Sequence, residues 1–93
     1  GRAGYAAFAP TKAAQRILAQ SIAREAGPKG VHVAYVTIDA VIDLRWTRKR
    51  YPDKPDDFFI KPEEIADEVF HVANQSKGAW SFDVEIRPHA ENW

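Results

Sequence analysis

The amino-acid sequence predicts an α/β fold with the order helix, strand, helix, strand and with parallel strands. Residues 10–26 carry apolar side chains at helical spacing, and residues 31–38 form a nearly continuous β-branched and aromatic run. Residues 79–86 alternate between apolar and polar side chains, as a half-buried strand does. A further helix is predicted between the two strands, and strands joined by a helix pair in parallel. Residues 1–93 are therefore expected to form a single α/β unit.

The first helix is predicted over residues 10–26. Pro10 is compatible with the first turn, where its missing N–H would have no intrahelical partner. Gly27-Pro28 is expected to end the helix, because glycine tolerates a left-handed cap and proline cannot continue the helix. The apolar positions at helical spacing are Ala13, Ala14, Ile17, Leu18 and Ile22.

The first strand is predicted over residues 31–38. Its nearly continuous apolar character favours a parallel strand covered on both faces. Residues 39–43 are expected to form the loop at its carboxyl end, where open α/β sheets bind their ligands. Residues 45–60 then form a long irregular excursion with one short helix, and excursions of this length are often functional.

The second helix starts at the sequence Lys61-Pro62-Glu63-Glu64, with proline at the first helical position and acidic residues in the first turn. The segment 74–78 ends it. Residues 79–86 then form a half-exposed edge strand that Pro88 terminates. Its apolar face consists of Trp80, Phe82, Val84 and Ile86, and its polar face of Ser81, Asp83 and Glu85.

Composition argues against several classes of function. Thirteen basic and thirteen acidic side chains give a formal net charge of zero, so a nucleic-acid partner is not expected. The absence of cysteine excludes disulfides and zinc–thiolate sites and fits a cytoplasmic location. No apolar run approaches the ~18 residues that span a bilayer, so no membrane partner is expected. The spacing of His32, His71 and His89 predicts no metal site.

The length of the chain predicts self-association. A chain of 93 residues buries only roughly 60–70% of the surface that its unfolded form exposes. Two strands and two helices also make a poor independent domain. The sequence contains no methionine, not even at position 1, which indicates a piece of a longer protein. A dimer or tetramer is therefore expected.

Several segments occur in an order that resembles a known family. The segment from Tyr5 to Lys12 reads Tyr-Ala-Ala-Phe-Ala-Pro-Thr-Lys, and the run REAGPKGVHVAYV follows at residues 24–36. The helix start at Lys61 and the final strand complete the order. Together they resemble the carboxyl-terminal portion of the short-chain dehydrogenase/reductase family, whose signature is Tyr-x-x-x-Lys. The resemblance covers nearly the whole chain. It implies a partial Rossmann-like, doubly wound fold that lacks the dinucleotide-binding half.

The resemblance implies that Lys12 is the signature lysine, which lowers the pKa of the catalytic tyrosine and contacts the nicotinamide ribose. Phe8 occupies the tyrosine position and cannot donate a proton, so the family's general acid is missing. Tyr5 is a candidate substitute. It lies seven residues from Lys12, however, which is roughly 10 Å along a helix, and a structural role at the helix start is favoured.

The resemblance also implies contacts to a cofactor and a substrate. The loop containing Asp39, Ala40 and Ile42 replaces the family's usual Pro-Gly loop beside the nicotinamide, and Leu44 stands in place of a threonine. NAD or NADP is expected in the full-length parent and no cofactor in the fragment alone. The excursion corresponds to the family's substrate lid, which makes Trp46, Tyr51 and Phe58 candidate contacts to a small-molecule substrate. Packing over the sheet edge is the alternative role for these three rings.

Two functions remain open. The first is the carboxyl-terminal part of a nicotinamide-dependent oxidoreductase that acts on a carbonyl or alcohol substrate and is inactive by itself. The second is a non-catalytic assembly or ligand-binding module, with Trp80, Phe82 and Trp93 in a subunit contact. The retained Lys12 favours the first and Phe8 the second. The basic cluster Arg45–Arg50 is expected to be neutralised by the acids of residues 53–57 instead of binding a phosphate.

Overall fold

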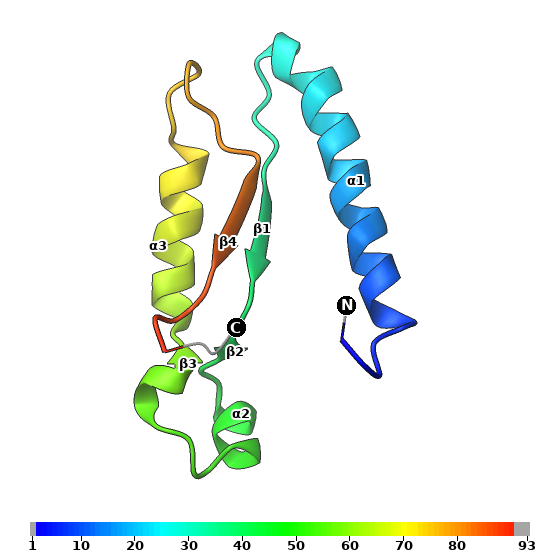
Figure 1. Ribbon diagram of the computed structural model, residues 1–93. Coiled ribbons are helices and arrows are strands. Elements are labelled where there is room, and N and C mark those ends of the chain that lie inside the picture. Colours follow the sequence, from blue (N-terminus) through cyan, green and yellow to red (C-terminus); the bar gives the residue numbers. More distant parts are fainter. Residues whose placement is uncertain (1, 91–93) are drawn as a thin grey trace.

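The computed structural model describes residues 2–90 and confirms the α/β architecture. Strands β1 and β4 pair in parallel, with Tyr35 opposite Asp83 and Ile38 opposite Ile86. The main elements are α1 (Phe8–Ala26), β1 (Tyr35–Ile38), α3 (Pro62–Ala73) and β4 (Asp83–Ile86). Figure 1 shows the β1–β4 pair between the two helices, with the amino-terminal end of α1 at the same end as the carboxyl ends of both strands.

A second, smaller sheet was not predicted. Strand β2 (Val41–Ile42) pairs in parallel with β3 (Phe59–Ile60), so the excursion between them is closed at its base. The short helix expected in the excursion is α2 (Arg45–Arg50), and a 3-10 turn, η2 (Asp56–Phe58), precedes β3. The expectation of irregular structure is therefore wrong for β2 and β3, because two-residue strands leave no periodic pattern in a sequence.

Both main strands are shorter than the sequence predicts. The β1–β4 ladder begins where the Tyr35 N–H donates to the Phe82 carbonyl over 2.6 Å. Before that point side chains replace the ladder: His32 Nε2 donates to the Ser81 carbonyl over 2.7 Å, and Gln75 Oε1 accepts the Ser81 N–H over 2.8 Å. Residues 31–34 and 79–82 therefore run beside each other without forming regular strands.

The end of α1 also differs from its prediction. Gly27 has φ −53°, a right-handed value, and continues into the 3-10 turn η1 (Gly27–Lys29). Gly30 is the residue in the left-handed region, with φ 84°. Since a side chain strains that conformation, Gly30 is the position in this turn that requires glycine. The start of α3 agrees with its prediction, with Pro62 first and Glu63 and Glu64 in the first turn.

The apolar core of the described residues is small: two of its members belong to β3 and the third lies in the last turn of α3. Its buried apolar members are Phe59, Ile60 and Val72. The radius of gyration is 15.7 Å, against about 12 Å for a compact chain of this length. Strand β1 is only half-buried, so the predicted covering of both faces is not found among residues 2–90. Strand β4 alternates between exposed and half-buried residues, as predicted.

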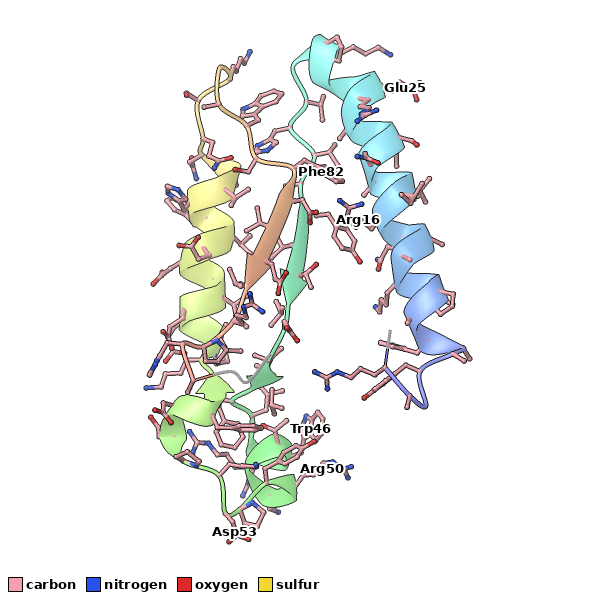
Figure 2. The ribbon with its side chains drawn as sticks, in the orientation of Figure 1. Arg16, Glu25, Trp46, Arg50, Asp53 and Phe82 are labelled. Atoms are coloured by element: carbon pink, nitrogen blue, oxygen red, sulfur yellow. The ribbon has the colours of Figure 1, made fainter. Side chains whose placement is uncertain are left out.

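Helix α1 contacts the sheet mainly through polar side chains. Arg16 forms an ion pair with Asp83 at 2.6 Å and lies 5.8 Å from the centre of the Phe82 ring (Figure 2). The Tyr35 hydroxyl donates to the Lys12 carbonyl over 3.3 Å. The apolar stripe of α1 is exposed instead, with 55% of Ile17 and 62% of Leu18 accessible. Within residues 2–90, no helix is both long and apolar enough to cross a membrane.

Candidate functional site

A cavity of about 320 Å³ lies at the carboxyl end of β1, between β2 and α2. Four residues that the sequence singled out share it: Ala40 and Ile42 as cofactor contacts, and Trp46 and Tyr51 as substrate contacts. Figure 2 shows Trp46 and Arg50 at this end of the molecule. The full lining is Ala40, Val41, Ile42, Leu44, Trp46, Thr47, Arg50 and Tyr51.

Thr47 fixes the start of α2 beneath the cavity. Its side chain is buried, with 3% of the residue exposed. The hydroxyl lies 2.6 Å from the Ile42 carbonyl, to which it donates, and accepts the Leu44 N–H over 2.9 Å. A hydroxyl at the third helical position that accepts the N-cap N–H is half of a capping box. Thr47 therefore ties α2 to β2.

Arg48 joins α2 to the loop after β2 and to the turn before β3. Its Nε and one terminal nitrogen donate to the two Asp43 oxygens over 2.7 and 2.8 Å. The same terminal nitrogen donates to Asp56 over 2.6 Å. The guanidinium also lies 4.1 Å from the centre of the Phe59 ring. One arginine thus holds three parts of the excursion together.

The charges of this cluster shift each other's pKa values. Hydrogen bonds from Arg48 hold the pKa of Asp43 and that of Asp56 below the usual range for a carboxyl group. Hydrogen bonds to Asp43 and then to Asp56 raise the pKa of Arg48. The basic cluster is accordingly neutralised in part at Arg48, although its acidic partners are Asp43 and Asp56 and not Asp53.

The signature segment lies at the amino-terminal end of α1. Phe8 is the first residue of the helix and is 56% exposed, and Lys12 Nζ lies 5.5 Å from the centre of its ring. Tyr5 precedes the helix in a turn, where its carbonyl accepts the N–H groups of Phe8 and Ala9. The Tyr5 and Phe8 rings are 5.8 Å apart. The lysine therefore faces an apolar ring where the family has a phenol.

Besides Lys12, two more predicted site residues lie outside the lining of the cavity. Asp39 continues the sheet ladder by donating its N–H to the Ile86 carbonyl over 3.0 Å, and its carboxylate lies 3.8 Å from Arg87. Phe58 packs behind the lining, with its ring 5.7 Å from that of Tyr51. The structure thus brings four of the predicted contacts together and leaves Lys12, Asp39 and Phe58 apart from them.

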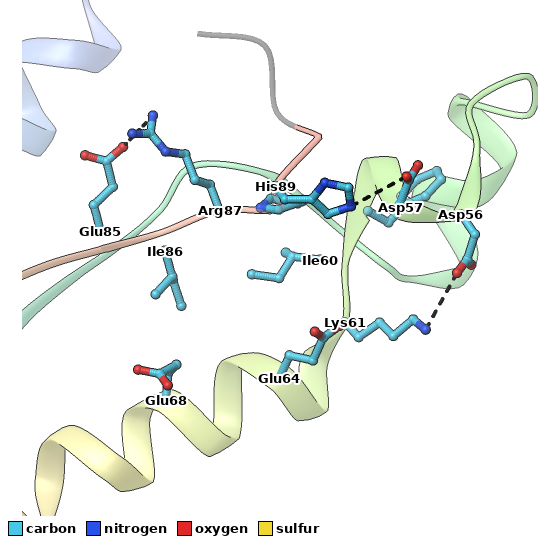
Figure 3. A pocket seen from close by; sticks show the side chains of 12 residues that line it. Asp56, Asp57, Ile60, Lys61, Glu64, Glu68, Glu85, Ile86, Arg87 and His89 are labelled. Atoms are coloured by element: carbon cyan, nitrogen blue, oxygen red, sulfur yellow. Dashed lines mark ion pairs between the residues drawn. The ribbon is translucent and has the colours of Figure 1, made fainter.

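A larger cavity of about 500 Å³ lies between β3, the first turns of α3 and the carboxyl end of β4 (Figure 3). None of the predicted site residues lines it. Its walls carry many charges, and several of them are paired: Arg87 with Glu85 at 3.2 Å and Lys61 with Asp56 at 3.6 Å. His89 Nε2 lies 3.7 Å from an Asp57 oxygen. Within the described part of the chain, no group of three His, Cys, Asp or Glu side chains is placed to hold a metal ion.

The aromatic residues expected in a subunit contact have neighbours within the chain. The Trp80 ring stacks on His32 at 4.7 Å between ring centres, and Phe82 lies beneath Arg16. Trp93 lies outside the described residues.

Thr47 and Arg50 line the cavity but were not predicted as residues of the site. Arg50 was counted only as part of a charge cluster, and Thr47 was not considered. Their spacing carried a signal, because Trp46 and Arg50 are four residues apart and so share one face of a short helix. Thr47 stands three residues after Leu44, which is the spacing of a capping box.

The fold and the position of the cavity define an α/β protein with its candidate site at the carboxyl ends of parallel strands. No protein-family model matches the chain, and no curated protein matches it. Among solved structures, the chain is similar to the crystal structure of a short-chain dehydrogenase from Rhodopseudomonas palustris, with a TM-score of 0.69 and 37% sequence identity. The resemblance to short-chain dehydrogenases is therefore confirmed, together with the partial Rossmann-like fold.

The match covers 96% of this chain but only 32% of the dehydrogenase. The chain thus spans about a third of the length of the protein it matches.

Proposed function

We propose that the chain forms part of the site of a nicotinamide-dependent oxidoreductase that acts on a small carbonyl or alcohol substrate. The observation that carries this proposal is the shared cavity. Ala40 lies between β1 and β2, Ile42 belongs to β2, and Trp46 and Tyr51 come from the excursion, yet all four line one space at the carboxyl end of β1. Open α/β sheets bind their ligands at this end.

The size of the cavity supports a site that holds the substrate and the nicotinamide ring but not the rest of the cofactor. At about 320 Å³ it is at the lower end of the range for ligand sites, which suits a small substrate with the nicotinamide ring beside it. The remainder of NAD or NADP would be held by parts of the full-length protein outside this chain. When bound, the nicotinamide supplies or accepts the hydride.

Lys12 supplies an ammonium group near the amino-terminal end of α1, which is at the same end of the molecule as the carboxyl ends of β1 and β4. In the proposed site its ammonium would orient the ribose of the cofactor. The apolar ring of Phe8, 5.5 Å from that ammonium, neither donates nor exchanges a proton. A proton donor other than residue 8 is therefore needed, and the chain alone would be inactive.

Binding of NADH and NADPH to the full-length protein, followed by fluorescence, tests the proposal. Lys12→Ala is expected to weaken binding, because it removes the charge beside the ribose. Lys29→Ala is the matched control, since Lys29 lies in η1 at the opposite end of α1 and should leave binding unchanged. If neither NADH nor NADPH binds, the oxidoreductase function is excluded.

A non-catalytic assembly module is the second candidate, and the exposed apolar stripe of α1 favours it. Ile17, Leu18 and Ile22 are each about half exposed or more. Self-association into a dimer or tetramer would cover this stripe. The proposed location of the protein is the cytoplasm. Light scattering should show an assembly that Leu18→Glu disrupts and that Gln15→Glu, at another exposed position of α1, leaves intact. A monodisperse monomer would contradict this candidate.

A further inference from the structure

We infer that the cavity between β2 and α2 accepts a carbonyl compound with an apolar body and a carboxylate group, and that Arg50 binds the carboxylate. This inference rests on the proposed function and names the substrate class for the same site. It also assigns a binding role to a residue that the resemblance does not single out.

The chemistry of the lining favours an anionic ligand. Most of the wall is apolar or aromatic, with Trp46 and Tyr51 supplying the rings. Arg50 is the charged side chain among the lining residues that the structure describes, and no carboxylate is among them. A mostly apolar wall with a small number of polar or charged groups is the usual form of a small-molecule site. Because the charge of Arg50 is positive, the lining favours an anionic ligand.

Arg50 is available to a ligand, in contrast to its neighbour Arg48. The Arg48 guanidinium is already occupied by Asp43 and Asp56. Across residues 2–90 no carboxylate pairs with Arg50, whose guanidinium lies 5.7 Å from the centre of the Tyr51 ring. A guanidinium presents a planar fork of donors that matches a carboxylate with two parallel hydrogen bonds.

The pairing of Asp43 prevents repulsion of such a ligand. Asp43 is the residue between Ile42 and Leu44, which both line the cavity. An unpaired carboxylate at this position would disfavour an anion nearby. Arg48 donates to both of its oxygens over 2.7 and 2.8 Å. The second carboxylate on Arg48, that of Asp56, also has Lys61 at 3.6 Å, so the two negative charges of the cluster are matched by two positive ones. Arg50 is therefore the charged residue of the lining that an anionic ligand would meet.

Two probes that differ in charge but not in shape test the inference. The first is 4-acetylbenzoate, an aryl ketone with a carboxylate, and the second is 4-acetylbenzamide, its neutral counterpart. Calorimetric titration of the full-length protein should show about tenfold tighter binding of the carboxylate, because charge-assisted bidentate hydrogen bonds are roughly twice as strong as neutral ones.

Variants of α2 identify the residue responsible. Arg50→Gln should remove the preference for the carboxylate, and Arg50→Lys should retain part of it. Arg45→Gln removes the same charge from an exposed residue of the same helix that does not line the cavity, and should leave the preference intact. Circular dichroism of each variant should match the unmodified protein.

Three results would overturn the inference: equal affinity for the two probes, binding of neither probe, or a preference that survives Arg50→Gln. The test is independent of the cofactor, because it measures binding of the probe and not turnover. Probe discrimination without nucleotide binding would remove the oxidoreductase function and leave the anion site. Nucleotide binding without probe discrimination would leave the oxidoreductase function in place and remove the anion site.

Discussion

The Arg48 guanidinium lies 4.1 Å from the centre of the Phe59 ring while its nitrogens donate to Asp43 and Asp56. Phe59 belongs to β3 and is 3% exposed, so the charged side chain rests on part of the small core. This relationship couples the packing of the second sheet to the position of α2. The cavity between β2 and α2 depends on both.

Arg48→Gln is expected to loosen the excursion, because glutamine cannot form the bidentate pair with Asp43 or bridge to Asp56. Hydrogen exchange of the full-length protein should show faster exchange over residues 43–60. Arg45→Gln, which removes a charge from the same helix, should change exchange little. Equal acceleration by both variants would show that Arg48 has no special role in holding the excursion.

The contribution of this cluster to stability should be lost in acid. The folded-state pKa values of Asp43 and Asp56 are lowered by Arg48. Their stabilisation is therefore fully present above the unfolded-state pKa of ~3.9 and is lost as the pH falls through the lower folded-state values. Thermal unfolding of the double variant Asp43→Asn/Asp56→Asn should vary less with pH between neutrality and acid than that of the unmodified protein.

Asp53→Asn is the control for the acid measurement. Asp53 lies at the tip of the same segment (Figure 2) and forms no ion pair with the described residues. The variant should keep the pH dependence of the unmodified protein. An unchanged pH dependence in the double variant would contradict the assignment of acid sensitivity to this cluster.

Thr47→Val should destabilise the protein by about 1–3 kcal/mol, because it leaves the Leu44 N–H and the Ile42 carbonyl without their partner in a partly buried place. The free energy of unfolding is measured by urea titration. Thr11→Val is the matched control: its hydroxyl donates to the Phe8 carbonyl on an exposed face of α1, and its loss should matter much less. Similar losses in the two variants would contradict the role of Thr47.

Phe8→Tyr should place a phenol next to the Lys12 ammonium. A nearby positive charge favours the phenolate, so the pKa of the new tyrosine should fall below the reference value of ~10. Absorbance of the phenolate during a pH titration measures it, as a difference from the unmodified protein. In Phe8→Tyr/Lys12→Gln the pKa should return toward the reference value. Identical titrations of the two variants would show that Lys12 does not act on position 8.

The sequence predicted the elements whose signals are periodic or chemically distinct. Helix α3 begins at Pro62, because proline and two glutamates define a helix start, and the alternation in β4 follows from its apolar and polar residues. The short strands β2 and β3 were not predicted, because a two-residue strand is defined by its pairing with another strand and leaves no pattern in the local sequence. The shorter length of β1 could not be predicted for a related reason: the His32 side chain, and not a backbone N–H, donates to the Ser81 carbonyl.

The candidate site was predictable in its location and only partly in its members. The resemblance led to Ala40, Ile42, Trp46 and Tyr51, which line one cavity. Arg50 was not singled out, because neighbouring arginines look alike in a sequence, and only the pairing of Arg48 with Asp43 distinguishes them. The exposure of the α1 stripe could not be predicted either, since periodicity identifies an apolar face but not what covers it.

Hydrogen exchange of the full-length protein with and without NADPH is the most direct test of the oxidoreductase account. If the chain forms part of a nicotinamide site, the nucleotide should slow exchange at residues 39–42 and at the amino-terminal end of α1 around Lys12. Exchange at residues 27–30, at the far end of α1, should be unaffected. Protection confined to other parts of the protein, with none at residues 39–42 or around Lys12, would contradict the oxidoreductase account.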